Sequence, residues 1–183
     1  MKKTQEHINT LLERCKKGDK TAQMQIYKAY YTAMYNTSLR ILKDTFEAED
    51  MMQEAFLTAF TKLDTFKGEV AFGAWLKRIV INKSLTQLKK TNTYENVKIE
   101  VVQVPPLEQE EDINYTSLKA QKVLEILNSL QENYRIVLNL HLIEGYDYEE
   151  ISAILGYSNQ NVRTTISRAK KKLKQQLVLE TAV

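Results

Sequence analysis

The chain has 183 residues, which is enough for one sizeable domain or two small ones. Its 43% hydrophobic residues are ordinary for a globular protein, and its 5 Gly and 2 Pro exclude collagen-like and low-complexity chains and favour helices. The net charge of +3 is too small to indicate a nucleic-acid partner by itself.

Apolar periodicity predicts four helices in the first half of the chain. Gly18 is suited to end the first helix, and Asp19 can cap the second. Asp44 or Thr45 can cap the third, whose first turns are acidic as the helix dipole favours. The predicted helices cover approximately residues 5–17, 20–43, 45–63 and 70–90, with a short break at 64–69.

The periodicity stops near residue 91, and residues 93–113 predict a flexible linker. This stretch contains Pro105-Pro106 and an acidic cluster at 108–112. Helical periodicity returns near Tyr115 and predicts helices at about 115–130 and 132–144. The expected fold class is therefore all-α, with two small helical domains, residues 1–92 and 114–183, joined by the linker.

Residues 148–168 predict a helix-turn-helix. Ser152 is small where the second helix must cross the first, and Gly156 lies where the chain must turn sharply. From Gln160 to Gln176 the chain carries six Lys or Arg and no Asp or Glu, so DNA binding is favoured over an ordinary helical hairpin. The side chains that can meet bases and phosphates are Asn159, Gln160, Arg163, Thr164, Ser167 and Arg168.

The third predicted helix carries a polar face. Asp50, Gln53 and Glu54 have i, i+3, i+4 spacing and so share one side of a helix, opposite its apolar stripe. The pattern is typical of a solubilising surface, and it also fits a docking surface for a basic partner.

The fourth predicted helix is basic and follows aromatic residues. Basic side chains near aromatic rings can follow a nucleic-acid backbone and hold unstacked bases. We expect Phe72 and Trp75 to lie in the core, one helical turn apart, whereas packing explains Phe66 less well. The basic side chains of this helix are Lys77, Arg78, Lys83, Lys89 and Lys90.

No catalytic, metal or cofactor site is expected. His141 and Glu144 could share a helix face at i, i+3, but a partly buried helix histidine explains the pair better than a metal site. The single cysteine, Cys15, excludes an internal disulfide framework. The polar N-terminus and the lack of a long apolar run lead us to expect a cytoplasmic protein with no signal peptide and no membrane insertion.

Two blocks of the chain resemble the extracytoplasmic-function sigma factors of bacterial RNA polymerase. Residues 44–57 (DTFEAEDMMQEAFL) and 66–82 (FKGEVAFGAWLKRIVIN) are similar to conserved region 2 of that family. Residues 130–138 (LQENYRIVL) and 144–158 (EGYDYEEISAILGYS) are similar to region 4. The order and spacing of the blocks fit this small class, which lacks the other sigma regions.

The resemblance implies partners for the region 2 block. It places the polymerase contact, made with the coiled-coil clamp helices of the β′ subunit, at Asp50, Gln53 and Glu54. The loop at about 66–71 and the helix after it would melt and read the −10 promoter element. Candidate contacts there are Phe66, Lys67, Arg78, Asn82 and Lys83.

The resemblance also implies that the region 4 helix-turn-helix reads the −35 element with its second helix in the major groove. Ser158 and Lys171 join the six candidates of that helix named above. Region 4 of the family also contacts the β flap through an apolar surface, and an anti-sigma factor is an expected partner. Departures from the family's commoner residues include Thr86 for Asp, Ser152 for Ala, and Lys170 and Lys171 for Arg.

Two other functions compete with a sigma factor. One is a stand-alone helix-turn-helix regulator that binds duplex DNA without polymerase, and the other is an all-helical interaction adaptor with a merely solvated basic face. The acidic third helix followed by the aromatic and basic fourth helix favours the sigma factor, because a simple regulator has no use for that block.

Overall fold

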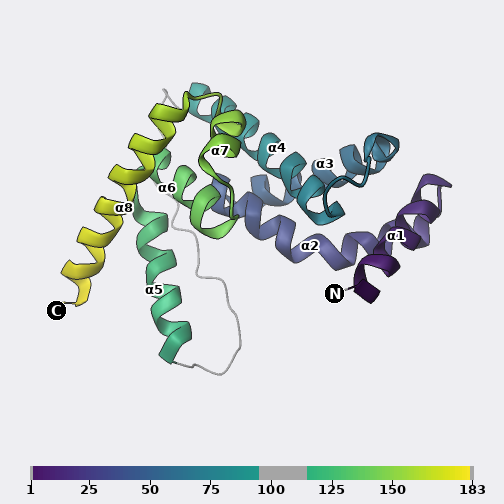
Figure 1. The fold of residues 1–183 in the computed structure, drawn as a ribbon, viewed down its shortest axis with the longest axis horizontal. Helices are drawn as coiled ribbons and strands as arrows, with labels where there is room; N and C mark the ends of the chain where they lie inside the picture. Colours follow the sequence, from purple (N-terminus) through teal and green to yellow (C-terminus); the bar gives the residue numbers. More distant parts are fainter. Residues whose placement is uncertain (1, 95–114, 182–183) are drawn as a thin grey trace. The chain divides into compact units, whose positions relative to one another are not determined.

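The computed structural model describes residues 2–94 and 115–181, with side chains for residues 7–92 and 120–179. The described residues form helices and turns without a strand, which confirms the all-α prediction. They fall into two compact units, one with helices α1–α4 and one with α5–α8 (Figure 1). The linker prediction lies outside the described residues, except for Thr93 and Tyr94, which belong to α4.

The first unit is a helical bundle built around α2. This helix packs against α1, α3 and α4, and α3 also packs against α4 (Figure 1). The elements are α1 (Lys2–Lys16), α2 (Lys20–Leu42), α3 (Thr45–Thr61), the 3-10 turn η1 (Leu63–Thr65) and α4 (Phe72–Tyr94).

The predicted caps of this unit are confirmed. The Asp19 carboxylate accepts the backbone N–H groups of Thr21 and Ala22 at 2.9 and 3.1 Å. Gly18 has φ +81°, a left-handed conformation that suits glycine where α1 ends. Asp44 accepts the Glu47 N–H at 2.8 Å and so begins α3. Capping satisfies N–H groups that have no partner within the helix.

Buried serines mark the crossing of α2 and α4. Ser38 and Ser84 are fully buried, and their hydroxyl oxygens lie 2.8 Å apart. Ser84 donates its proton to the Val80 carbonyl at 2.9 Å, so Ser38 must be the donor between the two. Their small size lets the two helix backbones approach closely, while each hydroxyl keeps a partner away from water.

The second unit contains a π-helical turn. The sequence predicted one helix over 132–144, but α6 (Glu132–Leu138) ends early and the π turn η2 (Asn139–Ile143) follows. Its i→i+5 bond runs from the Glu144 N–H to the Asn139 carbonyl at 2.9 Å. The other elements are α5 (Tyr115–Ser129), α7 (Tyr148–Leu155) and α8 (Asn159–Thr181).

The predicted helix-turn-helix is formed by α7 and α8. Asp147 and Glu150 make a reciprocal capping box at the start of α7. Gly156 ends α7 with φ +69°, as its place in the turn predicts. The Ser152 hydroxyl donates to the Tyr157 carbonyl across the turn, so this serine fixes the turn as well as being small. α8 buries Val162, Ile166, Ala169 and Leu173.

Candidate functional site

The polar face of α3 lies on the surface of the first unit. Asp50, Gln53 and Glu54 are all exposed, as their shared helix face predicts. Two large apolar side chains belong to the same face and were missed by the sequence reasoning. Phe46, 84% exposed, precedes Asp50 by one turn, and Leu57, 72% exposed, follows Gln53 by one turn. Both residues fall on the polar face of the predicted helix and outside its apolar stripe, so the helical periodicity could have predicted their exposure.

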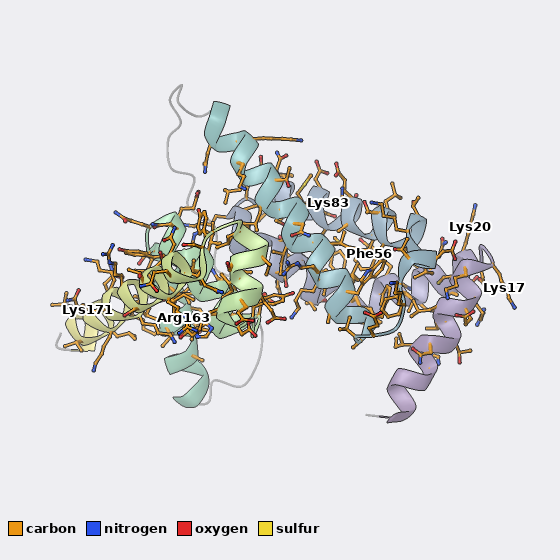
Figure 2. The ribbon with its side chains drawn as sticks, turned by 45° about the horizontal axis from the view of Figure 1, so that its top comes forward. Lys17, Lys20, Phe56, Lys83, Arg163 and Lys171 are labelled. Atoms are coloured by element: carbon orange, nitrogen blue, oxygen red, sulfur yellow. The ribbon has the colours of Figure 1, made fainter. Side chains whose placement is uncertain are left out.

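Hydrogen bonds tie this α3 face to α4. The Lys83 ammonium lies 3.0 Å from the Glu54 carboxylate and projects from α4 (Figure 2). One end of the same helix pair is held by Glu47, which accepts hydrogen bonds from Gln87 at 3.2 Å and Thr91 at 3.1 Å. Glu54 and Lys83, which the sequence assigned to different partners, are therefore neighbours in space.

Phe66 has a packing role that the sequence reasoning did not give it. Its ring centroid lies 5.6 Å from that of Phe72 and 5.3 Å from that of Trp75. Phe72 is fully buried, as predicted, whereas Trp75 is half-buried and packs against the core instead of lying within it. Phe66 is half-buried too, so the expectation that packing explains it poorly was wrong. The next residue in the chain, Lys67, is exposed.

The other candidates of this unit lie along α4. Arg78 and Asn82 are one turn apart and share a face, with Asn82 exposed and Arg78 half-buried. Lys83 follows directly and is the partner of Glu54. The structure thus groups Arg78, Asn82 and Lys83 on one stretch of α4, whereas Phe66 and Lys67 precede this helix.

The candidates on α8 lie on one surface of the second unit, all of them exposed except Thr164, which is half-buried. The buried positions of α8 leave Gln160, Thr164, Ser167 and Lys171 on the opposite side at i, i+4, i+7, i+11 spacing. Asn159, Arg163 and Arg168 are also exposed, and Figure 2 labels Arg163 and Lys171 at separate points along the helix. Ser158 accepts the Asn161 N–H at 3.2 Å, so it caps α8.

Arg163 makes a cation–π contact with an aromatic residue of α7. Its guanidinium carbon lies 5.3 Å from the ring centroid of Tyr148. The Tyr148 ring also stacks on His141, with centroids 5.2 Å apart and planes at 23°. Neither aromatic residue was expected in the site, because 22 positions separate His141 from Arg163 in the sequence.

His141 is held at both ring nitrogens. Its Nε2 atom lies 3.0 Å from the Lys170 ammonium, and its Nδ1 atom lies 3.0 Å from the Tyr146 carbonyl. Lysine can only donate, so Nε2 accepts and the Nδ1 proton points at the carbonyl. Both ring nitrogens are therefore in use within the protein. Among the described residues, no group of three His, Cys, Asp or Glu side chains is arranged to hold a metal.

The long helices are amphipathic or mixed in composition rather than apolar throughout. None of the helices in residues 2–94 and 115–181 has both the length and the apolar content needed to cross a bilayer.

Comparison with known families assigns each unit separately. Residues 26–93 match the model of Sigma-70 region 2, and residues 120–173 match that of Sigma-70, region 4. The first match spans the α3 face and most of α4, and the second spans the helix-turn-helix and the basic part of α8.

Individual proteins agree with this assignment. The chain is 30% identical over 185 residues to the ECF RNA polymerase sigma factor SigW of Bacillus subtilis, covering 93% of this chain and 96% of the relative. It is 28% identical over 171 residues to the ECF RNA polymerase sigma-E factor of Escherichia coli K12, covering 88% and 89%.

A solved structure shows the same fold. The sigma factor RpoE of Bartonella quintana, in complex with the anti-sigma factor NepR, superposes with a TM-score of 0.62 at 25% identity, covering 84% of this chain and 95% of that one. Both matched regions occur in the expected order, and the similarity to SigW covers 93% of the chain. The chain belongs to the extracytoplasmic-function family of RNA polymerase sigma factors.

Proposed function

We propose that this sigma factor docks on core RNA polymerase through the polar face of α3. The observation that carries the proposal is the exposure of Asp50, Gln53 and Glu54 on one face, inside the segment that matches Sigma-70 region 2. The acidic side chains fit basic residues of the β′ clamp helices, and Phe46 and Leu57 supply apolar contact at either end.

In the same proposal, the first unit opens and reads the −10 element. Lys67, Arg78 and Lys83 supply positive charge for the phosphate backbone, and the exposed Asn82 amide can hydrogen-bond a base. Because Phe66 is half-buried against Phe72 and Trp75, a base would meet only the exposed part of its ring. We therefore expect Phe66 to support a base from a fixed position, held by Phe72 and Trp75, and not to swing out as a mobile stacking side chain.

The second unit reads the −35 element in duplex DNA. α8 enters the major groove with Gln160, Arg163, Thr164 and Ser167 near the base edges. Asn159, Arg168 and Lys171 contact the flanking phosphates, and Ser158 joins them while capping the helix. Within the helix the base-reading residues precede the basic Arg168 and Lys171, which is the usual order in recognition helices, while Ser158 and Asn159 meet the DNA backbone at the helix start.

The sigma factor itself performs no chemistry, since nucleotide addition belongs to the polymerase. We place it in the cytoplasm, where the polymerase and the DNA are. Its second unit also contacts the β flap of the polymerase. An anti-sigma factor holds the sigma factor inactive. Support for that last partner comes from the complex of the Bartonella sigma factor with NepR.

Run-off transcription with purified core polymerase tests the proposal. The protein should direct initiation from a subset of promoters. Asp50→Arg with Glu54→Arg should weaken co-purification with core enzyme while leaving helicity unchanged. Glu13→Arg is the matched control, because its carboxylate is also exposed but belongs to α1. Transcription or core binding that is unaffected by the double substitution would remove the α3 face from the proposal.

A further inference from the structure

The contacts of Arg163 bear on how α8 recognises its promoter. An arginine that reads a base must give up the freedom of a long side chain, and that loss of entropy opposes binding. A side chain that is already ordered in the free protein loses less. The Arg163 guanidinium lies over the Tyr148 ring at 5.3 Å, so part of this ordering exists before DNA arrives.

The Tyr148 ring is itself held in place. It stacks on His141, and the His141 ring is fixed by the Tyr146 carbonyl on one side and the Lys170 ammonium on the other. The contacts join the π turn, the start of α7 and two cations on α8. Arg163 and Lys170 are two helical turns apart and therefore lie on one flank of α8.

The contact with Tyr148 leaves the guanidinium able to bind DNA. Where a guanidinium meets a ring with its flat face, its five N–H donors point outward in the plane of the group and are not used by the ring. The side chain can therefore rest on Tyr148 and still present a paired donor edge to a guanine. Lysine at this position would keep the charge but lose both the flat face and the paired donors.

We propose that Tyr148 is a positioning residue for promoter recognition, which orients Arg163 toward the base it reads, and that His141 secures the Tyr148 ring. This inference rests on the proposed function of α8 in −35 recognition. It assigns specificity to residues outside the recognition helix. Tyr148 and His141 act through Arg163 and Lys170, with no base contact of their own.

The test uses the full chain bound to core polymerase and a promoter library that is randomised in the −35 element. Tyr148→Leu should lower affinity for the preferred sequences by about three- to tenfold, the range expected for losing the order of one long side chain. Affinity for the other sequences should change little, so the ratio of affinities between preferred and other sequences falls. Tyr148→Phe keeps the ring and should retain the wild-type preference.

Four further variants sharpen the result. Arg163→Ala should remove the same preference, and adding Tyr148→Leu to it should have no further effect, because both act on one contact. Arg163→Lys should behave like Arg163→Ala in preference. Tyr134→Leu is the control, because it makes the same change at a half-buried tyrosine of α6. Circular dichroism and melting temperature confirm that each variant is folded.

The outcomes separate this inference from the proposed function. If the unaltered protein shows no −35 preference with core polymerase, the proposed role of α8 in −35 recognition is wrong. If it shows one that Tyr148→Leu leaves intact, or lowers equally for all sequences, Tyr148 does not position Arg163. Additive effects of Tyr148→Leu and Arg163→Ala would also overturn the inference, since the two residues would then act independently.

Discussion

Glu54 and Lys83 form an ion pair of 3.0 Å between α3 and α4. The two residues are 29 positions apart, and we assign one to polymerase and the other to promoter DNA. Their side chains are 58% and 28% exposed, so the pair contributes at most about 1 kcal/mol to stability. Its importance lies in the contact it makes between the proposed polymerase-binding and DNA-binding surfaces.

A charge swap separates the structural part of this pair from its binding part. Glu54→Lys with Lys83→Glu restores an ion pair between α3 and α4, so the melting temperature should return to near the wild-type value. The swapped protein should still bind core polymerase more weakly than the wild-type protein, because α3 then presents a cation to a basic partner. Glu54→Lys alone should lower both quantities. A swapped protein that binds core enzyme normally would show that Glu54 serves only the bundle.

Gly73 is predicted to favour the close packing of α4 on α2. A Cβ at this position would lie 2.7 Å from the Tyr30 Cε1 atom, and the Tyr30 ring is packed on Phe72 at 5.6 Å. Gly73→Ala should therefore destabilise the first unit by about 1–3 kcal/mol through overpacking, less about 1 kcal/mol regained in helix propensity. Chemical denaturation measures the difference.

The same substitution in a Tyr30→Leu background provides the control. Leucine lacks the ring atom that the new Cβ would meet, so Gly73→Ala should there be neutral or stabilising. An equal loss of stability in both backgrounds would contradict the assigned contact.

Asp19 should make the first unit sensitive to acid. The Ala22 N–H and the Arg14 side chain lower the pKa of the Asp19 carboxyl. A lowered pKa in the folded state stabilises the protein above the unfolded value of about 4, and this contribution is lost as the pH falls through the folded pKa. Asp19→Asn keeps an oxygen that accepts the capping bonds but does not titrate.

Thermal unfolding from pH 6 to acid measures this effect. The melting temperature of the wild-type protein should fall more steeply below about pH 4 than that of Asp19→Asn. Parallel curves for the two proteins would show that the Asp19 cap does not contribute to acid sensitivity.

Lys171 is predicted to contact a phosphate and to be blind to sequence. It is exposed on the outward stripe of α8, two turns beyond Thr164. Lys171→Ala should weaken every −35 sequence about equally and reduce the slope of log affinity against log salt by roughly 0.9. Gln175→Ala, one turn further along the same stripe and uncharged, should leave that slope unchanged. A change in base preference on Lys171→Ala would instead make Lys171 a base-reading residue.

Much of the fold could be predicted from local sequence patterns. Caps and turns depend on neighbours, so Asp19, Asp44 and Gly156 were recognisable without a structure. The π turn was not, because Asn139–Ile143 is as apolar as an ordinary helix and differs only in its hydrogen-bond register.

The candidate site was predictable only where its residues share one helix. The α3 face and the α8 stripe follow from helical spacing alone. The Glu54–Lys83 pair and the contact of Tyr148 with Arg163 join residues of different helices, and no periodicity reports such pairs. Phe66 was misjudged for the same reason, since its packing partners lie on α4.

The π turn has a consequence for how this protein can change in evolution. A π turn holds one more residue than a helix of the same rise, and a single deletion within 139–143 would convert it to an α-helix. Such a deletion would leave the flanking helical residues in register but shift the side chains within the turn, so His141 would lose its place beside the Tyr148 ring. The length of this segment, as well as its composition, is therefore under constraint. An insertion or deletion in this segment would disturb the contact of Tyr148 with Arg163 on another helix. Substitution of the exposed Leu142 would leave that contact intact.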